Sequence, residues 1–328
     1  VGVADITGFA KIDVTGPDAA AFLERMSANR IPSTDRGMRL VHMLTELGGI
    51  ESEMTITRLG PERFFLLSSI IAEQHDYDWL THHVAAAEDV TVTDVTEQYG
   101  ALAIAGPRAR DLLAKLTDAD LSNAGFRWLT AREIEVAGVP CRALRVSYAG
   151  ELGWELYHPM DRMEELYNAI VKAGAEYTIR DFGLYAINSM RMEKAYKGWG
   201  SELTTEVTMY EAGLERFLNL DVGEFVGRRA TVDAGVDGRR LAIVYMEIEN
   251  GDNDSQGNER IYHDGRVVGL TTSGAYGHTT GKSLAFGYVE PGLDHPGTEF
   301  EVRLLGEMRR ATVLAEAAYD PTNAAMRA

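Results

Sequence analysis

Apolar residues in the first half of the chain recur at helical spacing in three places. Proline suits the first turn of a helix, and the spacing predicts one helix that begins near Pro17 and a second that begins at Pro107. A third helix is predicted over 161–173, with Asp161 as its N-cap, a glutamate three residues later, and Gly174 at its end. The first of these is expected to be a packing helix.

Alternation of apolar and polar residues predicts strands in the same region. Residues 53–59 place Met54 and Ile56 on one face, so Glu53 lies on the opposite, polar face. A Gly-Pro pair separates this strand from a returning strand over 64–70.

A second pair of strands is predicted over 142–148 and 153–158. The residues between them form a natural hairpin link, which holds the two strands side by side. Tyr148 and Glu155 are then expected to lie near each other.

The pattern changes near residue 235 to short strands separated by glycine-rich turns. This pattern predicts a small all-β barrel or sandwich, with 250–258 as a loop inside it. We therefore expect one region over 1–234, with two interleaved α/β subdomains, and a barrel domain over 235–328. The predicted strands are 241–248, 259–262, 266–270, 283–289, 299–305 and 309–314.

Composition and charge narrow the function classes. The chain has 328 residues, 45% hydrophobic and 25% charged, as in an ordinary globular protein. A formal charge of −18 argues against a nucleic-acid or anionic-membrane partner. The longest apolar run, 64–72, is too short to span a bilayer, so no membrane helix is expected. The single cysteine, Cys141, fits a reducing compartment, and a cytoplasmic location is expected.

Several common sites are not expected. The segment 277–283 has three residues between its glycines and precedes a predicted strand, so it does not read as a phosphate loop. No dinucleotide fingerprint follows a strand, and the scattered histidines predict no metal site. Cys141 is expected to be a small buried residue, not a nucleophile.

Three carboxylates are candidates for chemistry. Glu53 follows a Gly-Gly pair that allows close approach of a ligand, although a solvated strand edge fits the same pattern. Glu193 ends a helical run and could instead form a surface ion pair with Lys194 or Lys197. Burial of the Glu155 carboxylate would cost free energy without hydrogen-bond donors that face it. The N–H groups of a ligand or an arginine side chain would supply such donors.

Taken together, five segments resemble the aminomethyltransferase (glycine-cleavage T-protein) family. The resemblance is greatest to the folate-binding C-terminal half of dimethylglycine and sarcosine dehydrogenases, in collinear order from Val1 to about Pro321. The family resemblance implies an α+β fold, a T-protein-like cloverleaf of two mixed α/β domains and a C-terminal β-barrel around a central folate channel. The segments are GGIESEMT (48–55), YAGELGWELY (148–157), SMRMEKA (189–195), TSGAY (272–276) and KSLAFGYV (282–289).

The resemblance also implies residue roles. Glu53 matches an acid beside the folate N5, where the T-protein pattern has Asp. The extra methylene displaces the carboxylate by about 1.5 Å, which matters to catalytic geometry. The implied tetrahydrofolate-binding residues are Tyr148, Glu155, Tyr157, Glu193, Met43 and Thr55.

The function implied is tetrahydrofolate-dependent one-carbon transfer. The product would be 5,10-methylenetetrahydrofolate, made from the iminium or formaldehyde that oxidative demethylation of dimethylglycine or sarcosine releases. Because those dehydrogenases carry a flavin domain before this region, FAD is expected on a partner chain or on a missing N-terminal domain. In a eukaryote the expected compartment is the mitochondrial matrix.

Two other functions stay open. A glycine-cleavage aminomethyltransferase would dock an acidic carrier protein, which a charge of −18 makes less natural. A folate-binding module without turnover, as a subunit of a flavin oxidoreductase, would fit the change from Asp to Glu.

Overall fold

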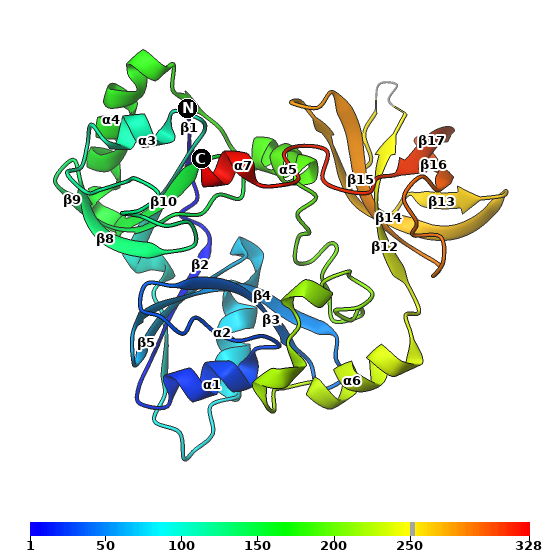
Figure 1. The fold of residues 1–328 in the computed structure, drawn as a ribbon, viewed down its shortest axis with the longest axis horizontal. Helices are drawn as coiled ribbons and strands as arrows, with labels where there is room; N and C mark the ends of the chain where they lie inside the picture. The colour runs from blue at the N-terminus through cyan, green and yellow to red at the C-terminus, as the bar shows by residue number, and fades with distance from the viewer. Residues whose placement is uncertain (250–252) are drawn as a thin grey trace. The chain divides into compact units, whose positions relative to one another are not determined.

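The computed structural model describes residues 1–249 and 253–328 (Figure 1). The chain forms two compact units. The first unit contains 1–42, 53–183 and 323–328, and the second contains 43–52 and 184–322. The expected domain boundary after residue 234 stays a prediction.

A six-stranded sheet in the first unit has the order β11-β1-β7-β10-β9-β8, with β1 and β11 parallel and the other pairs antiparallel. Trp154 and Leu156 on β10 belong to a buried core that α3 and α4 complete on one face. Side chains alternate along a strand, so Glu155 and Tyr157 lie on the opposite face. The elements are β1 (Gly2–Asp5), β7 (Tyr99–Ala105), β8 (Ala131–Val136), β9 (Val139–Leu144), β10 (Gly153–Pro159), β11 (Arg180–Asp181), α3 (Ala109–Leu113) and α4 (Met163–Gly174).

A five-stranded sheet has the order β3-β4-β5-β2-β6. The predicted first helix is confirmed as α1, with its apolar stripe fully buried. The predicted strand pair is confirmed as β4 and β5, and Met54 and Ile56 are buried as expected. The elements are β2 (Ala10–Thr15), α1 (Ala19–Met26), β3 (Met38–Leu44), β4 (Ile50–Gly60), β5 (Arg63–Ser68), α2 (Glu73–His82) and β6 (Thr91–Asp94).

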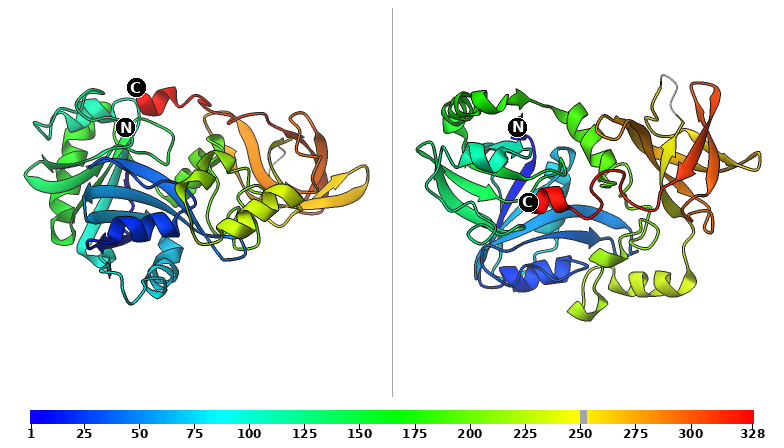
Figure 2. Two further views of the ribbon diagram at one scale, coloured as in Figure 1. Left: turned by 60° about the horizontal axis from the view of Figure 1, so that its bottom comes forward. Right: turned by 45° about the horizontal axis from the view of Figure 1, so that its top comes forward.

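The second unit contains a closed barrel with the strand order β12-β15-β14-β13-β16-β17, which confirms the predicted C-terminal barrel (Figure 2). β14 is longer than predicted because its second half continues to pair with β15. The elements are α5 (Leu184–Glu193), α6 (Arg228–Asp237), β12 (Ala242–Ile248), β13 (Arg260–His263), β14 (Arg266–Gly277), β15 (Lys282–Val289), β16 (Glu299–Leu304) and β17 (Glu307–Val313). Of the loop expected over 250–258, residues 250–252 lie outside the described residues.

Short helices complete the chain. The first unit also holds α7 (Ala324–Arg327). The 3-10 helices are η1 (Ile70–Ala72), η2 (Thr96–Gln98), η3 (Met160–Arg162), η4 (Ala175–Tyr177), η5 (Glu215–Phe217) and η6 (Leu220–Val222).

Three predicted boundaries are wrong. The strand expected over 142–148 ends at Leu144, where both neighbouring strands stop pairing with it. Helix α3 covers only part of 107–116. The prediction that Asp161 is the N-cap is also wrong. Helix α4 follows a 3-10 turn, and its N-cap is Arg162, whose side chain makes no capping hydrogen bond within the described part of the chain.

Thr57 on β4 offers a stability test. Its side chain is fully buried, and its hydroxyl has no hydrogen-bond partner among the described residues. Since an unsatisfied buried hydroxyl destabilises a fold, Thr57→Val is expected to raise the free energy of unfolding by about 1 kcal/mol. Urea denaturation would measure the change. Thr231 is equally buried but donates to the carbonyl of Gly227 at 2.9 Å, so Thr231→Val should destabilise instead. An equal loss in both variants would contradict the prediction.

Candidate functional site

The two sheets of the first unit face each other through an aromatic contact. The ring of Phe65 on β5 lies 5.4 Å from the ring of Tyr157 on β10, centroid to centroid. Phe65 is the cross-strand partner of Thr57, and cross-strand partners share a face of a sheet. Alternation then puts Glu53 on that face of the five-stranded sheet, and Glu155 on the facing side of the six-stranded sheet. We call these two facing sides the inter-sheet surface.

Glu53 is held at the inter-sheet surface by a buried histidine. The Nε2 atom of His42 on β3 lies 2.9 Å from Oε2 of Glu53. The His42 side chain is 0% exposed, whereas that of Glu53 is 20% exposed. The carboxylate is thus partly open to solvent and anchored through one oxygen. This agrees with the expectation that Glu53 points away from the apolar layer.

Glu155 is a half-buried carboxyl with one protein donor among the described residues. The hydroxyl of Tyr157 donates to Oε2 of Glu155 at 2.7 Å. Its cross-strand partners are Ala103 and Leu144, which offer no polar atoms beyond the backbone. Burial therefore raises the pKa of the Glu155 carboxyl to about 7, although the Tyr157 hydrogen bond acts in the opposite direction. Such a carboxyl is suited to accept N–H groups from a ligand.

Arg142 is a buried cation beside Tyr157. It is the cross-strand partner of Tyr157, and its guanidinium lies 4.5 Å from the ring centroid of Phe65 and 5.4 Å from that of Tyr99. Its Nε donates to Glu133 at 2.9 Å. Sequence analysis left open an arginine as the partner of Glu155. Among the described residues, the side-chain hydrogen bond that Glu155 accepts comes from Tyr157 and not from an arginine.

Glu193 ends α5 in the second unit and binds a turn of the barrel. Its Oε1 accepts the backbone N–H groups of Thr279 and Thr280 at 2.7 and 2.8 Å. The alternative ion pair with Lys194 is wrong, because Lys194 is bonded to Asp320. The turn joins β14 to β15, which confirms that a strand follows the glycine-rich segment.

The other predicted site residues have different surroundings. Tyr148 lies beyond the end of β9 and is 38% exposed, and Thr55 lies on β4, two residues from Glu53. Met43 is fully buried on β3 and belongs to the second unit. That Tyr148 and Glu155 lie near each other stays a prediction.

The Gly-Gly pair before Glu53 has a role within the protein. Gly48 adopts φ +83°, a conformation that favours glycine, in the turn between β3 and β4. A Cβ at Gly49 would lie 1.9 Å from the carbonyl oxygen of Thr205. The close approach is thus to the protein's own backbone.

His42 was missed by sequence analysis. It precedes Glu53 by 11 residues, and the two are brought together only by the pairing of β3 with β4. The Gly-Gly turn is the sequence feature from which His42 could have been predicted, because a tight turn brings the residues on its two sides together.

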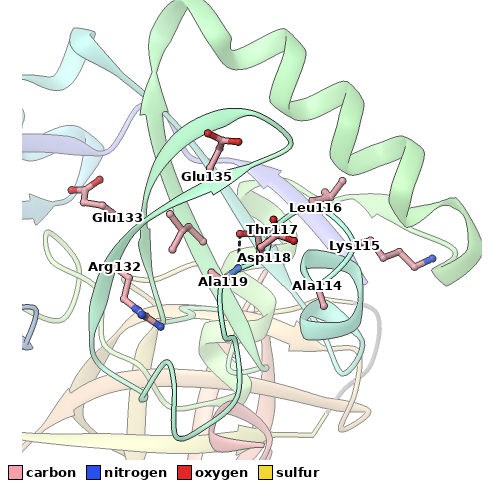
Figure 3. A pocket seen from close by; sticks show the side chains of 10 residues that line it. Ala114, Lys115, Leu116, Thr117, Asp118, Ala119, Arg132, Glu133 and Glu135 are labelled. Atoms are coloured by element: carbon pink, nitrogen blue, oxygen red, sulfur yellow. Dashed lines mark hydrogen bonds between the residues drawn. The ribbon is translucent and has the colours of Figure 1, made fainter.

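Cys141 and one pocket are further places where chemistry could be sought. Burial raises the pKa of the Cys141 thiol to about 12, so a thiolate nucleophile is not available there. An open pocket of about 460 Å³ lies between residues 114–119 and β8, and its lining includes none of the predicted site residues (Figure 3).

Metal centres and membrane helices were also sought. Over residues 1–249 and 253–328, no group of three or more His, Cys, Asp or Glu side chains is placed to hold a metal ion. In the same part of the chain, every helix is too short or too polar to cross a bilayer.

Comparison with protein families gives two matches that together cover most of the chain. Residues 1–222 match the GCVT N-terminal domain. Residues 239–320 match the glycine cleavage T-protein C-terminal barrel domain.

Individual relatives agree. The chain is 39% identical over 318 residues to mitochondrial dimethylglycine dehydrogenase of Mus musculus, covering 96% of this chain but 36% of that protein. It is 32% identical over 323 residues to the aminomethyltransferase of Herpetosiphon aurantiacus, covering 97% of this chain and 86% of that protein. The crystal structure of glycine cleavage system aminomethyltransferase T from Bartonella henselae has the same fold, with a TM-score of 0.88, 24% identity, and coverage of 98% of this chain and 86% of that one.

Proposed function

Because the chain belongs to the glycine cleavage T-protein family, we propose that it is a tetrahydrofolate-dependent one-carbon transferase of the aminomethyltransferase type. The observation that supports this most is the Glu53 carboxylate. It is partly exposed and anchored by His42 on a surface that faces Glu155 and Tyr157. A carboxylate so held can act as a general base toward a bound ligand.

The proposed one-carbon donor is the iminium or formaldehyde product of oxidative N-demethylation of dimethylglycine or sarcosine. The proposed product is 5,10-methylenetetrahydrofolate. Support comes from the relative named dimethylglycine dehydrogenase, which is 39% identical to this chain.

Tetrahydrofolate fits the donor and acceptor set of the candidate residues. In the first unit, Oε2 of Glu155 accepts from Tyr157, whereas Oε1 accepts no hydrogen bond among the described residues. In the second unit, Glu193 uses Oε1 for the barrel turn, and Oε2 likewise accepts none from the described residues. Either carboxylate keeps one oxygen that can accept an N–H group of a pterin ring. Such charged hydrogen bonds contribute about 1.5–3 kcal/mol each.

When bound, tetrahydrofolate supplies N5, the nucleophile that takes up the one-carbon unit. Glu53 would stabilise positive charge that develops on a nitrogen beside it and accept the proton that this nitrogen loses. Tyr148 and Tyr157 would line the walls of the site, and Met43 and Thr55 would add contacts to the ligand.

A flavin dehydrogenase is the proposed source of the one-carbon unit. The chain spans about a third of the length of the dimethylglycine dehydrogenase that it matches. A flavin domain in the same polypeptide or on a partner subunit would carry FAD, oxidise the methylated amine and release the one-carbon unit to this chain.

Assay of the product tests the proposed function. The protein is mixed with tetrahydrofolate and formaldehyde, with and without a flavin dehydrogenase and its methylated amine. A protein-dependent rate of 5,10-methylenetetrahydrofolate formation above the uncatalysed condensation supports the transferase. Folate binding without a rate gain would favour the non-catalytic module. Turnover only with an aminomethylated carrier protein would favour the glycine-cleavage reaction.

A further inference from the structure

We infer that His42 is the positioning residue of Glu53, holding one carboxylate oxygen so that the other is presented to the ligand. This inference rests on the proposed function, because it assigns a role within the same site. It concerns a contact inside the first unit and depends on no other part of the molecule.

The contact joins a fully buried donor to a partly exposed acceptor. His42 is fully buried on β3, and its backbone carbonyl also accepts the N–H of Ala28 at 2.9 Å, just after α1. The imidazole is therefore fixed by its strand, by its burial and by the segment that follows α1. Glu53 is the partly exposed member of the pair, with its Oε2 atom 2.9 Å from Nε2.

The chemistry of the pair sets the direction of the hydrogen bond. An ionised carboxylate only accepts, so Nε2 carries the proton and donates it to Oε2. Among the described residues, Oε1 of Glu53 accepts no hydrogen bond. A proton taken from a ligand would then go to Oε1.

The length of the glutamate side chain explains why such a restraint is needed. Glutamate has one more rotatable bond than aspartate, and its carboxylate explores a wider volume when exposed. A displacement of about 1 Å in a catalytic group can cost about 100-fold in rate. A hydrogen bond from a buried, immobile donor removes this freedom.

Steady-state kinetics of His42 variants provide the first part of the test. His42→Leu should lower kcat about 10- to 100-fold, with KM for tetrahydrofolate within about twofold of the wild-type value. His42→Gln, which can place an N–H donor at a similar reach, should recover most of this loss. His158 is an equally buried histidine of the first unit, and its Nδ1 lies 2.9 Å from the carbonyl oxygen of Pro159. His158→Gln is the matched control and should keep the wild-type kcat.

A spectroscopic readout in the unliganded protein provides the second part and needs no folded His42 variant. In protein labelled with ¹⁵N-histidine, Glu53→Gln should shift the Nε2 resonance of His42 and leave that of His158 unchanged. An unchanged His42 resonance would overturn the inference. Wild-type kcat in His42→Leu, beside a slow Glu53→Gln, would also overturn it while leaving the proposed function in place. Wild-type rates in both would instead contradict the proposed function.

Discussion

Replacement of Glu53 by glutamine is expected to slow formation of 5,10-methylenetetrahydrofolate about 10²- to 10⁴-fold, the usual contribution of a general acid or base. Glutamine keeps the size of the side chain and an oxygen acceptor for His42, but it cannot take up a proton. The dissociation constant of tetrahydrofolate should change little, because the proposed anchor of the ring at the inter-sheet surface is Glu155. Stopped-flow kinetics and fluorescence titration of the same preparation would measure both quantities.

Two further variants sharpen this test. Glu62 lies exposed in the turn between β4 and β5 of the same sheet, so Glu62→Gln should leave the rate unchanged. Glu53→Asp keeps the charge but draws the carboxylate back by about 1.5 Å, away from His42. It should be slower than the wild type if the His42 contact sets the geometry. An unchanged rate in Glu53→Gln would remove Glu53 from the mechanism.

Tetrahydrofolate affinity is expected to fall about tenfold between pH 8 and pH 6 through the titration of Glu155, because the pKa of this carboxyl is raised to about 7. The ionised carboxylate is the form that accepts the ligand's N–H groups, and it becomes the minor form below pH 7. Glu155→Gln should weaken binding at pH 8 about 10- to 100-fold and abolish this pH dependence. Calorimetric titrations at several pH values would test both statements.

Stability gives an independent check on Glu155. Its folded-state pKa of about 7 lies above its ordinary value of 4.5, so the folded state loses stability as the pH rises from about 4.5 to about 7, and the loss stays constant at higher pH. Glu155→Gln should therefore be more stable than the wild type at pH 8, and the difference should shrink toward pH 5. Glu135, exposed on β8 of the same sheet, provides the control, and Glu135→Gln should alter neither affinity nor its pH dependence. A wild-type pH profile in Glu155→Gln would contradict the assignment.

Local periodicity was sufficient to predict which way the Glu53 carboxylate points. Glu53 alternates with Met54 and Ile56 along the strand, so the burial of these apolar residues fixed the opposite face for the acid. The barrel strands were predicted for the same reason, since short alternating segments between glycine turns pair with their neighbours.

Partners that are distant in sequence could not be predicted in this way. His42 meets Glu53 through the pairing of β3 with β4, which a local pattern does not specify. Glu193 binds Thr279, 86 residues later in the chain, through the backbone of a barrel turn. The strand expected over 142–148 stops at Leu144 because its neighbours end there, which only the assembled sheet determines.

The most direct test of the central claim is a crystal structure of this chain with tetrahydrofolate bound. We expect the pterin ring at the inter-sheet surface, with N5 within about 3.5 Å of a carboxylate oxygen of Glu53. We also expect its N–H groups to donate to Glu155. A ring bound away from this surface, with Glu53 facing only water, would contradict the account.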